Sequence, residues 1–178
     1  LLFLLTGSIL LPLKTLLMNT LTLGATLGAL VLAFQEGWLG TPLDYTGPAA
    51  IEVTSLVFLF AVIFGLATDY AVLVMARIKE RYDAGDSNEE AVAVGIARTG
   101  RVITAAALAI ALVFLAFAVS SVFFVKQIAI GMAVGVMVDA TIVRALLVPS
   151  LMRLLGDWNW WAPKPLRRLQ VRLGFSEA

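Results

Sequence analysis

The fold is decided by residues 51–77, which read IEVTSLVFLFAVIFGLATDYAVLVMAR. From Val53 to Ala76 this stretch is apolar and long enough to cross a bilayer as one helix, and Asp69 is its only charge. A charge at the centre of a bilayer helix costs roughly 2.5–3.5 kcal/mol, so such a residue usually faces a bundle interior. Because the neutral acid is cheaper to hold in hydrocarbon than the carboxylate, Asp69 is a candidate for reversible protonation, assisted by the Tyr70 hydroxyl. The alternative interpretation is a buried polar clamp between helices.

The composition is that of a membrane protein. Hydrophobic residues make up 61% of the 178 residues and charged residues 14%, and the mean hydropathy is +0.96. Apolar runs of this length predict an all-α membrane protein, a polytopic helix bundle. The net charge of +1 does not indicate a nucleic-acid partner, and none is predicted.

The residue types that are missing narrow the function further. The chain has no Cys and no His, which excludes disulfides, thiolate nucleophiles, His-based triads and His or Cys metal sites. It also has no Walker-type GxxxxGKS/T motif and no GxSxG motif. We therefore expect no enzyme activity, no metal and no cofactor, and we expect an ion gradient as the source of energy.

Five transmembrane segments are predicted within a bundle of residues 1–156. They cover about 1–13, 16–34, 53–76, 102–119 and 128–151, and the first is expected to be the end of a truncated helix. A capping box at Ser87 predicts an amphipathic helix over 88–99, lying along the cytoplasmic membrane surface. Residues 157–178 are predicted to form a cytoplasmic tail whose Trp and basic side chains suit the lipid headgroup layer.

Basic residues are concentrated in the loops on one side of the predicted bundle. Loop 35–50 has no Lys or Arg and loop 120–127 has only Lys126, whereas residues 77–101 and the tail from Arg153 hold five basic residues each, mostly Arg. Because an excess of Lys and Arg marks cytoplasmic loops, we expect a multi-pass protein of the plasma membrane with a cytoplasmic C-terminus.

Small residues on the predicted spans indicate where helices approach closely. Gly65 precedes Asp69 by four residues, and Gly131 and Gly135 share a face with Asp139. Small residues at this spacing allow close backbone packing. We therefore expect Gly65, Gly131 and Gly135 at helix contacts and both acids pointing into the bundle.

Asp139 allows two interpretations. It is either a second proton site or an acid held permanently by a cation such as Arg101 or Arg144, and we favour the ion pair. On an α-helix, at about 100° per residue, Arg144 lies about 140° around from Asp139. Direct pairing within one helix is therefore not expected, and Arg144 would snorkel or pair with another helix.

Several stretches, taken in order along the chain, point to one family. They are Leu11–Lys14 with Met18 and Asn19, Phe64–Tyr70, Ala97–Ala107, Val125–Gln127, and Asp139–Arg144 continuing to Pro149. Each stretch is weak alone, but the ordered set is specific. It resembles the MMPL family, the lipid-exporting large membrane proteins of mycobacteria and their actinobacterial relatives, within the resistance–nodulation–division (RND) superfamily.

The resemblance implies a transporter of two similar halves, each with a transmembrane bundle and an extracytoplasmic porter domain. This chain would be the last five helices of the second half, with the N-terminal half of the polypeptide as its partner. An Asp–Tyr pair in each half forms a proton relay in this family, and here the pair maps onto Asp69 and Tyr70. Phe64 stands where some members carry a further acid, which leaves Asp69 as the main titrating group. The implied function is proton-motive-force-driven export of lipids or lipophilic molecules.

Other functions remain open from the sequence. A non-transporting sterol-sensing or scaffold bundle of the same superfamily is the main alternative. An intramembrane aspartyl protease would pair Asp69 with Asp139 as a dyad, which requires the carboxyl groups nearly in contact. The order Asp-Tyr and the surroundings of Asp139 disfavour it, and the Asp-Tyr stretch also disfavours a protein-export accessory subunit.

Overall fold

The computed structural model describes residues 2–38 and 50–163. Every regular element within these ranges is a helix, which confirms the predicted all-α membrane bundle. In chain order the α-helices are α1 (Leu2–Thr6), α2 (Leu10–Leu30), α3 (Val53–Asp83), α4 (Asn88–Phe117), α5 (Phe123–Val138) and α6 (Val148–Leu155). Two segments are π-helical, Val31–Gln35 after α2 and Asp139–Leu147 between α5 and α6, and a 3₁₀ turn, Gly156–Trp160, follows α6.

Four continuous helical stretches in the described ranges are long and apolar enough to cross a membrane. They are Leu10–Gln35, Val53–Asp83, Asn88–Phe117 and Phe123–Trp160. The 31 residues of α3 rise about 46 Å at 1.5 Å per residue, which exceeds a hydrocarbon core of about 30 Å. The charged end of α3 therefore projects beyond the bilayer, where the Arg81–Asp86 ion pair (2.6 Å) lies at the turn into α4.

The described residues contain the four full spans, and the first predicted segment, the truncated residues 1–13, is not one helix. Helix α1 ends at Thr6, and Gly7 adopts a φ of 67°, in the left-handed region that favours glycine. Helix α2 then begins at Leu10, so the end of the predicted segment 1–13 belongs to the next span. Pro12 lies in the first turn of α2, where amides have no partner within the helix, and so it does not end a helix there.

The predicted surface helix 88–99 is not separate. It is the first part of α4, which runs unbroken from Asn88 to Phe117. The predicted capping box is present: the Ser87 hydroxyl accepts from the Glu90 amide, and the Glu90 carboxylate accepts from the Ser87 amide. Nothing after this box stops the helix, because Gly100 costs helix stability without breaking hydrogen bonding.

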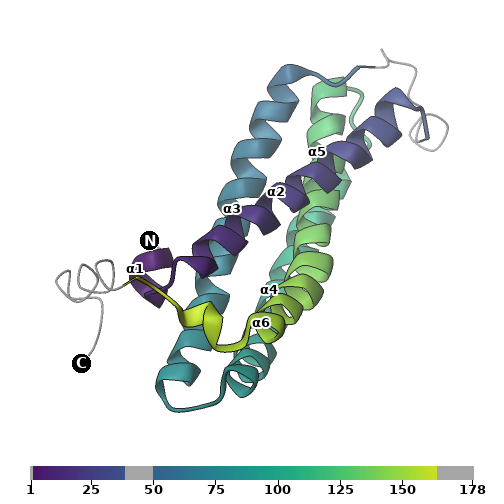
Figure 1. The fold of residues 1–178 in the computed structure, drawn as a ribbon. Coiled ribbons are helices and arrows are strands. Elements are labelled where there is room, and N and C mark those ends of the chain that lie inside the picture. The colour runs from purple at the N-terminus through teal and green to yellow at the C-terminus, as the bar shows by residue number, and fades with distance from the viewer. Residues whose placement is uncertain (1, 39–49, 164–178) are drawn as a thin grey trace.

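Helix α5 forms the centre of the bundle. In the helical stretch Phe123–Trp160, which begins with α5, 56% of the 18 most apolar consecutive residues are buried. The corresponding share in α4 is 17%. Figure 1 shows α2 crossing the bundle obliquely in front of α3 and α5, with the α3–α4 turn and α6 at the same end of the molecule. The contacts are close at Gly131 and Gly135, where an added Cβ would lie 2.6 Å from side-chain carbons of Leu59 and Ile63, respectively.

Candidate functional site

The two acids on which the sequence analysis focuses lie in different surroundings. Asp139 is buried in the bundle, at 5% exposure. Asp69 is on the exposed side of α3, so the expectation that it points into this bundle is wrong for the chain by itself. Its neighbour Tyr70 is half-buried on an adjacent face of the helix, because consecutive residues differ by about 100° around the axis.

Asp139 and Arg144 form the ion pair that the favoured interpretation predicts, but they form it within one continuous helical stretch, where direct pairing was not expected. Arg144 Nε donates to Asp139 Oδ2 at 2.6 Å, and both side chains are buried. The 140° separation holds only for an α-helix, whereas residues 139–147 form a π-helix with hydrogen bonds from i to i+5. The wider turn brings residues five apart onto one face, so the two charges meet.

Neighbouring helices satisfy the remaining groups of this pair. Arg144 Nη2 donates to the Ala67 carbonyl oxygen on α3, and the guanidinium carbon lies 5.2 Å from the centre of the Tyr70 ring. Thr22 on α2 donates to the other Asp139 oxygen at 3.4 Å. A buried charge is tolerable only with such partners, so α2, α3 and the π-helical segment are joined at one polar point.

A polar stripe on α2 completes the site, and it was not predicted from the sequence. Thr15, Asn19, Thr22 and Thr26 are all buried on one face of a mainly apolar span. Asn19 Nδ2 donates to Thr68 Oγ1 on α3 at 3.1 Å. The signal was present in the sequence, because polar residues three or four apart on a transmembrane helix mark a face turned away from lipid.

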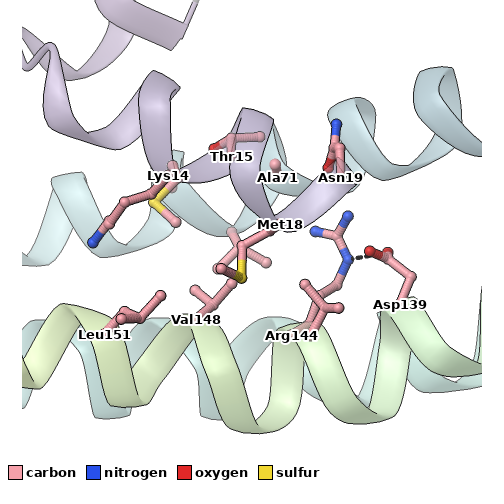
Figure 2. A pocket seen from close by; sticks show the side chains of 12 residues that line it. Lys14, Thr15, Met18, Asn19, Ala71, Asp139, Arg144, Val148 and Leu151 are labelled. Atoms are coloured by element: carbon pink, nitrogen blue, oxygen red, sulfur yellow. Dashed lines mark hydrogen bonds and ion pairs between the residues drawn. The ribbon is translucent and has the colours of Figure 1, made fainter. Parts of the chain in front are cut away.

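A small cavity lies beside the ion pair, between α2, α3 and the end of the last span (Figure 2). Its volume is about 30 Å³. Figure 2 shows Lys14 and Leu151 at one end and Asn19 and Asp139 at the other, with Arg144 reaching in from the π-helical segment. Its lining thus mixes charged and polar groups with apolar side chains.

Asp69 lies on an apolar face of α3 that no described part of the chain covers. Along this face the exposed residues are Phe58, Ala61, Gly65, Asp69 and Leu73. No described atom lies within 4 Å of the position a Gly65 Cβ would take, so the predicted packing of Gly65 is not made in this chain. A carboxyl group beside small residues on a bare helix face is suited to meet another helix closely.

Two further expectations concern the cation that pairs with Asp139 and a pairing of Asp69 with Asp139. Arg101 is exposed on α4, and the cation that pairs with Asp139 is Arg144. Asp139 is buried and bonded to Arg144 and Thr22, whereas Asp69 is exposed on α3, and no hydrogen bond joins the two carboxyl groups within residues 2–38 and 50–163. The structure therefore does not bring together the dyad that an aspartyl protease requires.

The fold is an all-helical membrane bundle with a buried ion pair and an acid on an uncovered apolar face. These features define a polytopic membrane protein with charged side chains inside its membrane-spanning helices. Comparison with known proteins specifies the family, because the MMPL family model matches residues 1–174. The chain belongs to the MMPL family.

Named relatives agree with this assignment. The chain is 47% identical to a putative membrane protein of Streptomyces coelicolor and 45% identical to the trehalose monomycolate exporter MmpL3 of Mycobacterium tuberculosis, with 99% of the chain covered in both. It is 38% identical, over 96% of its length, to the mycolic acid-containing lipids exporter MmpL11 of Mycolicibacterium smegmatis. The chain spans only 25%, 19% and 18% of the lengths of these three relatives, respectively.

Proposed function

We propose that this chain is half of the proton-relay bundle of an exporter that moves lipids or lipophilic molecules across the plasma membrane, driven by the proton motive force. Relatives named as lipid exporters support the transport of lipid and an activity other than catalysis. The chain is transmembrane throughout its described spans, so the membrane supplies both the substrate and the gradient. The proposed partner is the other half of the polypeptide.

One observation carries the proposal: Asp69 is exposed in the middle of an apolar transmembrane face. An ionised side chain turned to lipid is costly, so this face needs a protein partner or water. The bare positions at Ala61 and Gly65 allow a second helix to approach closely. The face is therefore the proposed contact with the other half, and Asp69 is the group proposed to titrate there.

In the proposed mechanism, protonation of Asp69 removes a charge from the contact between the halves. The loss of charge changes which packing of α3 is most stable, and the helix shifts against its partner. One charge crossing the membrane supplies about 2.3 kcal/mol per 100 mV, so one or a few protons suffice to bias such a shift. Porter domains elsewhere in the polypeptide would convert the shift into outward movement of substrate.

The proposed orientation places the α3–α4 turn and α6 in the cytoplasm. Both lie at one end of the bundle (Figure 1), and the Lys and Arg residues of 77–101 and Arg153 are concentrated there. Cytoplasmic segments carry such an excess, which supports a cytoplasmic C-terminus.

The test is transport by the complete polypeptide in proteoliposomes under a proton gradient, comparing the wild type with Asp69→Asn. Asn keeps the volume and polarity of Asp but cannot titrate, so we expect transport to fall to background while insertion is unchanged. Asp83→Asn is the matched control, because Asp83 is an exposed carboxylate that pairs with Lys79 near the end of α3.

Normal transport by Asp69→Asn under the same gradient would show that Asp69 is a polar clamp and would overturn the proposed relay. A gradient-independent flux in the wild type would overturn the proposed energy source.

A further inference from the structure

Two exposed arginines on α4, Arg98 and Arg101, form no direct ion pair with the described part of the chain. They are three residues apart, so they differ by about 60° around the helix and project from one face. The carboxylate of Glu80 on α3 is bound by Arg77 at 2.8 Å, and Arg98 also attracts it. Two guanidinium groups thus share one carboxylate and Arg101 adds a further positive charge, which makes this surface of the α3–α4 hairpin basic.

The other acids of the hairpin lie towards its turn, at the end of the bundle that also holds α6 (Figure 1). They are Asp83, Asp86, Glu89 and Glu90. The first three are paired with basic residues, and Glu90 is bonded within the capping box. Glu90 precedes Arg98 by eight residues, about 12 Å along α4, which exceeds the Debye length of about 8 Å at physiological ionic strength. These acids therefore leave the charges of Arg98 and Arg101 largely uncompensated.

The apolar length of α4 sets the depth of both arginines in the membrane. From Val102 to Phe117 the helix has no charged residue, and this stretch rises about 24 Å at 1.5 Å per residue. A hydrocarbon core is about 30 Å thick, so the whole stretch is needed to cross it. Arg101 therefore lies at the boundary of the hydrocarbon and Arg98 about 4.5 Å further out, where long basic side chains reach the lipid phosphates.

The face of α4 that continues from the arginines into the hydrocarbon is apolar, and the described residues leave it uncovered. Ala105, Leu108 and Leu112 lie within about 40° of Arg101 around the helix. All three are exposed, Leu108 at 50% and Leu112 at 58%. Leu112 is about 16 Å from Arg101 along the axis, close to half of the hydrocarbon core, which is the depth of one leaflet. The arginines and this stripe therefore match the headgroup and the acyl chains of one lipid.

We propose that Arg98 and Arg101 form a binding site for an anionic phospholipid of the adjacent leaflet, with an acyl chain along Leu108 and Leu112. The planar guanidinium group donates two parallel hydrogen bonds to a phosphate, so two of them hold one headgroup. A zwitterionic lipid carries its own ammonium group beside the phosphate and gains less from these charges. In the orientation proposed above this is the cytoplasmic leaflet, whose anionic lipids attract basic segments. The site goes beyond the proposed function, because it holds a lipid of the bilayer and not the exported molecule.

The test is native mass spectrometry of the complete polypeptide in detergent, titrated with phosphatidylglycerol or with phosphatidylcholine of the same acyl chains. We expect the wild type to bind phosphatidylglycerol more tightly than phosphatidylcholine. The double variant Arg98→Gln/Arg101→Gln should bind phosphatidylglycerol about fivefold more weakly for each arginine removed, the equivalent of about 1 kcal/mol per basic residue at an anionic membrane surface. Equal affinity of the wild type for the two lipids would overturn the proposal without any variant.

Arg153→Gln is the matched control, because Arg153 is exposed at the same end of the bundle but is paired with Glu89. It removes the same kind of charge, and we expect it to keep the wild-type affinity for phosphatidylglycerol. An equal loss in Arg153→Gln would show that only the total charge matters and would overturn the site. Glycerol phosphate at the same concentration should not displace the lipid, because it lacks the acyl chains. Displacement by glycerol phosphate would show a site for a free phosphate and would overturn the assignment to a lipid.

Discussion

At the scale of single residues, the Asp139–Arg144 pair places two opposite charges in the interior of the bundle. Each charge alone is expensive to bury, and their attraction with the bonds from Thr22 and to Ala67 offsets that cost. Breaking a buried pair by removing one partner typically costs about 3–5 kcal/mol, because it leaves the other charge uncompensated. Removing both together is expected to cost much less.

A double-mutant cycle tests this balance with Asp139→Leu, Arg144→Met and the double variant. We expect each single substitution to lower the stability of the purified protein by about 3–5 kcal/mol, and the double variant to be more stable than either. Thermal unfolding midpoints in detergent measure the order of the three. Additive losses would show that the two charges do not stabilise each other.

The sequence identified both intramembrane acids but did not show which of them is buried within this chain. Asp139 is buried as predicted from its glycine-rich face, whereas Asp69, predicted by the same argument, is exposed, since Gly65 meets no described part of this chain. Periodicity shows which residues share a face of a helix. It does not show whether that face is covered by the same chain or by another part of the assembly.

At the scale of helices, the contact between α3 and α4 depends on the absence of a side chain at Gly95. A Cβ there would lie 3.1 Å from the Ile78 backbone nitrogen and α-carbon, and backbone moves less readily than the end of a side chain. Gly100 lies on the same helix with no described atom within 4 Å of its Cβ position. Both glycines therefore lie inside the same helix, and they differ in what packs against them.

Alanine at these two positions should change stability in opposite directions. Gly95→Ala is expected to destabilise the protein by about 1–3 kcal/mol through overpacking. Gly100→Ala is expected to stabilise it by about 0.5–1 kcal/mol, because Ala loses less backbone entropy in a helix. Unfolding midpoints of the two variants against wild type give the signs, and a stabilised Gly95→Ala would show that α3 and α4 can separate without cost.

The helices also show where prediction from sequence reached its limit. Long apolar runs located every span, because bilayer thickness alone sets their length. The ion pair of Asp139 was predicted, but its formation with Arg144 within one helical stretch was not, because the prediction assumed 3.6 residues per turn through residues 139–147. Nothing in the apolar pattern distinguishes a π-helix there. The capping box at Ser87 was found because a cap depends on local residues only.

At the scale of the whole molecule, the described part of the bundle has a packed centre and apolar helix faces that it leaves uncovered. Helix α5 is enclosed by its neighbours, while the face of α3 with Phe58, Gly65 and Asp69 is exposed. The relatives are about four to five times as long as this chain, from the 25% and 19% of their lengths that it spans. The bare face of α3, which carries Asp69, is one side on which further parts of such a polypeptide can pack.

Enlarging Gly65 tests that contact. Gly65→Leu adds a side chain where this chain leaves open space, so it does not disturb the half-bundle itself. If the other half packs against this face, overpacking of about 1–3 kcal/mol will oppose the working arrangement of the halves. We expect transport to fall by about fivefold to a hundredfold, since 1.4 kcal/mol corresponds to a factor of ten. Transport by Gly65→Leu is compared with Ala109→Leu, on the exposed side of α4, which should retain wild-type transport. Equal activity of the two variants would mean that the Asp69 face meets lipid or water and not another helix.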